Sequence, residues 1–268
     1  MIKKFSALCL TSTMIAAPAF ATSSYDFSDP TKTATAIQGE VTNLNVDLED
    51  NASSERQTAN GKATIFGAGI TSEVFNNDGV RAAFLFGYNY LDRAYGRSFG
   101  EKKDTDAKID NGHRNSFKVG FAAAKDFDSR LVDTVYTNFN YYWLQESTPL
   151  FSEGYDLNLT AKLSSVNIGS GELNFYPSYT YTQMKSGNKS VQDESINSYA
   201  VRIAYAMEAF SVYAEPKRVD GKFVYGLGAG YNFTDDFVIG ARYEQYTESH
   251  NKIKLDLTGF TLALDYRF

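Results

Sequence analysis

The chain has 268 residues, of which 43% are hydrophobic and 15% aromatic, and its mean hydropathy is −0.35. After the first 21 residues, no stretch approaches the roughly 18 consecutive apolar residues of a membrane helix. Without Lys3 and Lys4, 24 basic and 32 acidic residues remain, a net charge of −8. This acidic balance argues against nucleic acid as a partner.

The amino-terminal segment has the pattern of a secretory signal peptide. Lys3 and Lys4 precede an apolar stretch over residues 5–17, and Ala19-Phe20-Ala21 supplies a small-x-small cleavage site. The pattern predicts cleavage after Ala21, which leaves residues 22–268 as one exported domain. The only cysteine, Cys9, lies in the predicted leader, so the mature chain relies on no disulfide.

The mature chain reads as a succession of strands in which apolar and polar side chains alternate with period two. The first half contains five predicted strands, over residues 33–48, 62–75, 80–90, 115–125 and 132–145. The second half contains seven, over residues 155–166, 172–184, 198–207, 210–217, 222–233, 237–246 and 260–268. Ten strands is the nearest alternative count.

The connections between these strands alternate in length. Short turns are predicted at 76–79, 126–130, 169–171, 208 and 234–236. Longer connections are predicted at 49–60, 93–112, 148–154 and 186–194, whereas those at 219–221 and 250–251 are short. The longest, from Arg93 to Gly112, carries mixed charge and is interpreted as a mobile loop, a pore lid or an adhesive tip.

The last strand carries a further signal. Phe260, Leu262, Leu264, Tyr266 and Phe268 share one face, and the chain stops on the terminal aromatic residue. This strand resembles the carboxy-terminal strand of Gram-negative outer-membrane β-barrels. The resemblance implies that the barrel-insertion machinery reads these five side chains, and that outer-membrane lipid surrounds the protein.

The repeated strand–turn pattern, the signal peptide and the last strand together predict an all-β fold, a transmembrane antiparallel up-and-down β-barrel of about twelve strands. Lipid requires every backbone polar group to be paired, so an exported membrane chain without spanning helices must form a closed barrel. Twelve strands is even, as in bacterial single-chain barrels, and the 19 tyrosines and 20 phenylalanines suit aromatic girdles. The alternative is a soluble periplasmic β-sandwich rich in tyrosine.

Side chains opposite the apolar face are predicted to point into the lumen. The charged members of this set are the candidate pore-lining residues Arg81, Lys118, Lys162, Arg202, Glu215, Lys217, Arg242 and Glu244. They predict either a narrow passage that weakly prefers anions or tolerates sugars, or a bore blocked by paired charges, because buried charges are usually paired. Inward glycines at 226, 228 and 230 are predicted to bend the wall or to make room in the lumen.

The favoured function is a porin-like channel for passive diffusion of small hydrophilic solutes, without enzymatic activity or a cofactor. An adhesin or receptor barrel acting through its outer loops is the alternative, and a hydrolase is a third. The hydrolase hypothesis rests on His113, which follows Asp104, Asp106 and Asp110, and on His250. No metal-ligand spacing accompanies these histidines, and both are interpreted as solvated loop residues.

Overall fold

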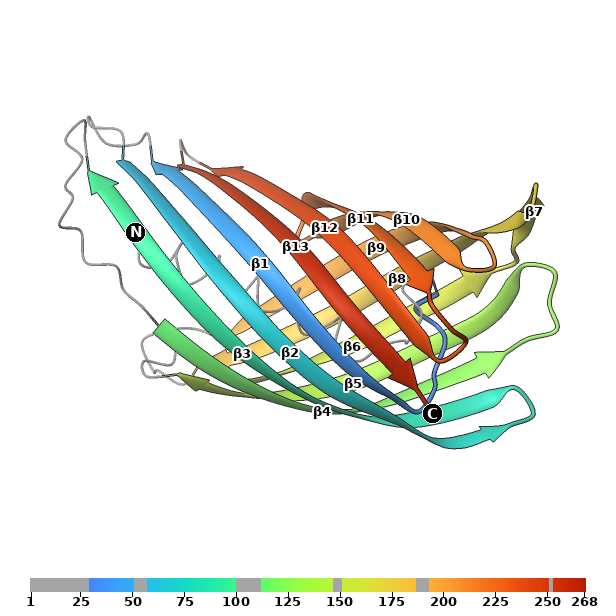
Figure 1. Ribbon diagram of the computed structural model, residues 1–268. Coiled ribbons are helices and arrows are strands. Elements are labelled where there is room, and N and C mark those ends of the chain that lie inside the picture. Colours follow the sequence, from blue (N-terminus) through green and yellow to red (C-terminus); the bar gives the residue numbers. More distant parts are fainter. Residues whose placement is uncertain (1–28, 51–56, 100–111, 147–150, 187–192, 251–252) are drawn as a thin grey trace.

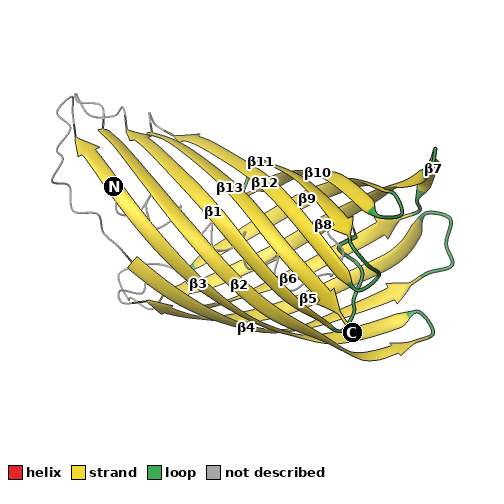
Figure 2. Cartoon of the chain, in the orientation of Figure 1, coloured by secondary structure: helices red, strands yellow, loops and turns green. Residues whose placement is uncertain are grey.

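The computed structural model describes residues 29–50, 57–99, 112–146, 151–186, 193–250 and 253–268, and these residues form an antiparallel β-barrel (Figures 1 and 2). In this part of the chain, no helix is both long enough and apolar enough to span a membrane. The signal peptide predicted for residues 1–21 lies outside the described residues.

The strands follow one another around the barrel in chain order. The strands of the first half are β1 (Ala36–Asp50), β2 (Gln57–Asn77), β3 (Val80–Phe99), β4 (Gly112–Asp126), β5 (Val132–Glu146) and β6 (Phe151–Leu163). They are followed by β7 (Val166–Ile168), β8 (Gly171–Ser186), β9 (Glu194–Ala206), β10 (Phe210–Val219), β11 (Lys222–Asn232), β12 (Phe237–His250) and β13 (Ile253–Arg267).

The barrel closes because its first strand pairs with its last. The β1–β13 register runs from Ala36 opposite Arg267 to Asp50 opposite Ile253, and β6 pairs with β8 on the other side. The short β7 continues the line of β6 along β8, so β6 and β7 count as one strand of the wall and the barrel has twelve strands. The predicted count of twelve is confirmed, and closure removes the free edges that β1 and β13 would otherwise present.

Proline explains the break between β6 and β7. The β6–β8 ladder ends where Thr160 faces Ser178, and the next residue of β8 is Pro177, which has no N–H to donate. Pro216 acts similarly in β10, where the ladder to β9 skips from Ala214 to Lys217. Both prolines therefore coincide with interruptions of the hydrogen-bond ladder.

Several strands are longer than the sequence pattern predicts. β2 covers Gln57–Asn77, β3 runs on to Phe99, β6 begins at Phe151 and β13 at Ile253. The predicted connection 93–112 is therefore partly strand, and its residues 100–111 lie outside the described part. The predicted strand 155–166 is also corrected, because β6 ends at Leu163.

One end of the barrel carries the β2–β3, β4–β5, β7–β8, β9–β10 and β11–β12 turns, and we call it the turn end. The start of β1 and the end of β13 lie there together, as expected for termini on one side (Figure 1). Asp78 and Gly79 in the β2–β3 turn have φ values of 50° and 69°, which confirms the predicted tight hairpin. Asp220 and Gly221 form an equivalent turn at the opposite, outer end, with φ values of 46° and 86°.

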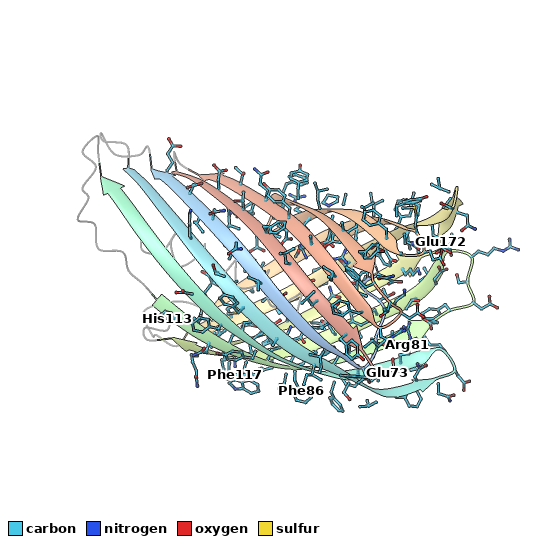
Figure 3. All side chains as sticks on the ribbon, in the orientation of Figure 1. Glu73, Arg81, Phe86, His113, Phe117 and Glu172 are labelled. Carbon is cyan, nitrogen blue, oxygen red and sulfur yellow. The ribbon has the colours of Figure 1, made fainter. Side chains whose placement is uncertain are left out.

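The outer surface of the barrel carries an apolar band. In β3 the side chains of Phe84, Phe86 and Tyr88 are 39–51% exposed, whereas the alternate residues Ala83 and Leu85 are buried. In Figure 3, Phe86 and Phe117 project away from the wall. About four or five outward apolar residues per strand match the 9–11 residues that a tilted strand needs to cross a bilayer.

The terminal strand contributes to this band as predicted. Its five alternating apolar residues, Phe260, Leu262, Leu264, Tyr266 and Phe268, are 45–68% exposed. Tyr266 and Phe268 stack edge to face at the turn end with ring centroids 5.4 Å apart. Their recognition by the insertion machinery stays a prediction.

Candidate lumenal passage

The eight predicted pore-lining residues all lie on the face of the wall opposite the apolar band. Five of them, on β9, β10 and β12, form one cluster: Arg202, Glu215, Lys217, Arg242 and Glu244. Lys118 lies on β4, while Arg81 and Lys162 lie nearer the turn end. Figure 3 shows Arg81 and Glu73 at that end.

Glu215 is the centre of the cluster. Its carboxylate accepts a hydrogen bond from Arg202 Nε at 2.6 Å and lies 3.0 Å from Lys217 Nζ. Arg242 Nη2 lies 3.8 Å from the same carboxylate. The Glu215 side chain is only 8% exposed, so one buried anion serves three cations.

Glu244 supplies the second anion of the cluster. It accepts a hydrogen bond from Lys217 Nζ at 2.9 Å and another from Arg242 on its own strand. Arg267, near the end of β13, lies 3.7 Å from Asp236 at the turn end. Of the two predicted alternatives for these charges, the structure has the feature of the second, because the inward charges of this cluster are paired.

Two acidic residues extend this cluster around the barrel, and sequence reasoning missed both. Glu40 on β1 lies within electrostatic range of Lys118 and Arg242, and Asp156 on β6 within range of Lys118. Asp156 and the predicted Lys162 are six residues apart on β6, so the period-two alternation places both on the inward face. Glu40 likewise alternates with the outward Ile37 and Val41.

We call the eight charged residues of this level the charge ring: Glu40, Lys118, Asp156, Arg202, Glu215, Lys217, Arg242 and Glu244. Four are cationic and four anionic, so the ring carries no formal net charge. Lys118 and Arg242 are each only 2% exposed. Such buried charges require close partners, and their balance removes the predicted excess of basic charge.

Inward glycines make room for polar side chains beside this ring. A Cβ on Gly228 would collide with the ring of Tyr213, and a Cβ on Gly67 would approach Glu40 to 2.6 Å. Tyr213 in turn supports Arg202, whose guanidinium carbon lies 4.3 Å from the ring centroid. Gly228 therefore makes room in the lumen as predicted, because the absence of a Cβ leaves space for the ring of Tyr213.

This arrangement predicts different responses from two neighbouring glycines of β11. Gly228→Ala is expected to lower the free energy of unfolding by about 1–3 kcal/mol, because the added methyl overpacks Tyr213. Gly226→Ala is the matched control, since its Cβ would meet Glu215 at an ordinary 3.6 Å. Urea titration of the refolded variants measures both. Equal stabilities would contradict the proposed role of Gly228.

A polar cavity of about 120 Å³ lies beside the charge ring, between β5, β6, β8, β9 and β10. Much of its lining is neutral and hydrogen-bonding, including Asn138, Asn140, Asn158, Thr160, Thr180 and Thr182. Asn140 donates a hydrogen bond to Asp156 at 2.8 Å. Among the described residues, the buried Asn140 Oδ1 has no hydrogen-bond partner, and it packs against Gly120.

Towards the outer end the polarity of the wall inverts. On four neighbouring strands, β13, β1, β2 and β3, the inward residues Leu44, Ile65, Leu91 and Leu257 pack together, with Tyr246 against them. On the next strand, β4, the buried Arg114 lies opposite Leu91. Leu44 lies four residues beyond Glu40 on β1, so this apolar collar sits on the outer side of the charge ring. Leu144, Met184 and Val224 are buried inward residues near the outer ends of β5, β8 and β11.

The outside of the wall is polar at the same level. Thr64 donates a hydrogen bond to the exposed Asn43 at 3.0 Å, and Thr247 donates one to Asp256 at 2.8 Å. A wall with polar groups outside and apolar groups inside is the arrangement of a β-sheet in water. The outer ends of β1, β2, β12 and β13 therefore extend beyond the apolar band.

The two histidines lie on strands that are not neighbours. His113 belongs to β4, so its placement on a loop is corrected, and it is outward and exposed. Its Nδ1 lies 3.3 Å from Asp92 and 2.9 Å from the Tyr90 hydroxyl. His250 ends β12, and four strands, β3, β2, β1 and β13, lie between β4 and β12. Within the described ranges, no group of three or more His, Cys, Asp or Glu residues could hold a metal ion.

Comparison with solved structures identifies the fold. The chain is similar to the transport unit of the autotransporter AIDA-I from Escherichia coli, with a TM-score of 0.56 and 11% identity over 95% of this chain and 97% of that one. It has the fold of an outer-membrane β-barrel.

Two further solved structures share this fold. The COG4313 outer membrane channel from Pseudomonas putida F1 has a TM-score of 0.56 and 8% identity over 91% of this chain and 98% of that one. The translocator domain of autotransporter NalP from Neisseria meningitidis has a TM-score of 0.50 and 13% identity, with 98% of each chain covered. No family model and no curated protein matches the sequence. At these identities the likeness concerns the barrel alone.

Proposed function

We propose that this protein is an outer-membrane channel for passive diffusion of small, uncharged hydrophilic solutes. The observation that carries the proposal is the polar cavity within the lumen, beside charges that neutralise one another. Hydrogen-bonding amides and hydroxyls suit neutral polar solutes, because they replace part of the hydration shell. Because the charge ring carries no formal net charge, the passage is expected to prefer neither anions nor cations.

The apolar collar favours a second candidate. Aliphatic side chains of β13, β1, β2 and β3 line the lumen at the outer end, and a bore closed by such apolar groups would exclude water. A barrel closed there would act through its outer loops, as a receptor or an adhesin. The fold is compatible with both functions, and they differ in whether solute crosses the lumen.

Solute efflux from proteoliposomes separates the two candidates. Vesicles loaded with uncharged polyols of increasing size are expected to lose the small ones and to retain the large ones, with a sharp cut-off. Vesicles containing heat-unfolded protein serve as the control for leakage. Retention of even glycerol by folded, heat-modifiable barrels would reject the channel and favour the loop-based function.

A further inference from the structure

The segment before β1 lies within the turn end of the barrel. Asp29 and Thr31 are only 5% and 1% exposed, which is unusual for polar residues near the start of the described chain. In Figure 1 this segment is the blue line that enters β1 beside the end of β13. We call residues 29–35 the lumenal strap.

One end of the strap is held by a buried ion pair to β6. Asp29 Oδ2 lies 3.2 Å from Lys162 Nζ, on the inward face of that strand. The other carboxylate oxygen of Asp29 accepts hydrogen bonds from the backbone N–H and the hydroxyl of Thr31, at 3.0 and 2.6 Å. Both oxygens of Asp29 are therefore engaged.

The other end of the strap is attached to β2. Thr33 donates a hydrogen bond from its hydroxyl to Glu73 Oε2 at 3.0 Å, and the Glu73 backbone N–H donates one to Thr35 Oγ1 at 3.1 Å. Because β3, β4 and β5 separate β2 from β6, the strap crosses part of the bore. Between its attachments, Pro30 contributes to the lining of the polar cavity.

We propose that the lumenal strap is an internal constriction of the passage, fastened by the Asp29–Lys162 ion pair and able to leave the bore when that pair is lost. Release widens the turn end of the cavity. It also exposes one uncompensated charge, whose sign depends on which partner remains. The effect on conduction rests on the proposed channel function, whereas the position of the strap does not.

Four variants of the full mature protein test the strap in a planar bilayer. Asp29→Asn is expected to raise single-channel conductance on the order of two-fold and to shift selectivity towards anions, because Lys162 becomes uncompensated. Lys162→Gln is expected to raise conductance similarly and to shift selectivity towards cations. Their opposite selectivities distinguish loss of this ion pair from general damage to the barrel.

Two combined variants complete the set. The double variant Asp29→Asn/Lys162→Gln is expected to be wide, with the selectivity of the unmodified protein. The charge exchange Asp29→Lys/Lys162→Asp is expected to restore the narrow conductance. Conductance unchanged in all four variants would overturn the proposal.

A labelling experiment tests the strap without any current. In the mature protein, whose predicted sequence, residues 22–268, contains no other cysteine, Thr31→Cys is expected to resist a maleimide reagent in the folded barrel and to react when Asp29→Asn is added. Asp128→Cys, exposed in a turn at the same end, is the control that reacts in both. Protection followed by release in a protein without conductance would support the strap and reject the channel. Rapid labelling at position 31 in the unmodified barrel would overturn the strap.

Discussion

Replacing Glu215 with glutamine is expected to make the reconstituted protein anion-selective. The substitution removes the carboxylate shared by Arg202, Lys217 and Arg242, so positive charge exceeds negative charge at the charge ring. The free energy of unfolding is expected to fall by about 3–5 kcal/mol, because removing one partner leaves buried charges uncompensated. Reversal potentials in a salt gradient and urea titration measure the two effects.

Glu172→Gln is the matched control for this substitution. Glu172 is exposed near the start of β8, where water screens its charge. This variant is expected to keep both the selectivity and the stability of the unmodified protein. If Glu215→Gln behaved like Glu172→Gln, the charge ring would not set the electrostatics of the lumen.

Truncation of Leu91 to alanine is expected to weaken the barrel at its outer end. Leu91 is 3% exposed and packs in the apolar collar with Leu44, Ile65 and Leu257. The loss of buried contacts and the resulting cavity are expected to cost about 2–5 kcal/mol in unfolding free energy. Conductance is expected to rise as well, because a smaller side chain reduces the hydrophobic barrier to water.

Leu159→Ala is the matched control, because it removes the same side chain from the outward surface of the barrel instead of from the apolar collar. Leu159 is 51% exposed on β6 and belongs to the outward apolar band instead of a packed cluster. Its truncation is expected to cost clearly less and to leave conductance unchanged, measured by the same urea titration and single-channel recording. Equal losses from the two leucines would show that the collar is not a packed constriction.

The barrel itself could be predicted from the sequence because period-two alternation is a local signal. In β3 and β13, alternate residues face lipid, and runs such as Phe84 to Tyr88 mark strand and face together. The signal fails where the outside faces water. Beyond Thr64 on β2 and Thr258 on β13 the outward residues are polar, so pairing continues after the apolar pattern has stopped.

The lumenal partners were harder to predict because they depend on register between strands. Alternation places Arg202, Glu215 and Arg242 inside, but it does not say that one carboxylate serves all three. The strap was missed for a different reason. Residues 29–32 precede the first predicted strand, 33–48, and residues 33–35 of that prediction belong to the strap, because β1 begins at Ala36. The role of Asp29 appears only once Lys162 is brought beside it.

The most direct measurement is single-channel current through the refolded, unmodified mature protein in a planar bilayer. The proposed function predicts discrete, reproducible steps and a reversal potential close to zero in a salt gradient of equally mobile ions, because the charge ring is balanced. A folded, heat-modifiable barrel that gives no steps would contradict the proposal of an open passage. A strongly ion-selective current would contradict the neutral lumen.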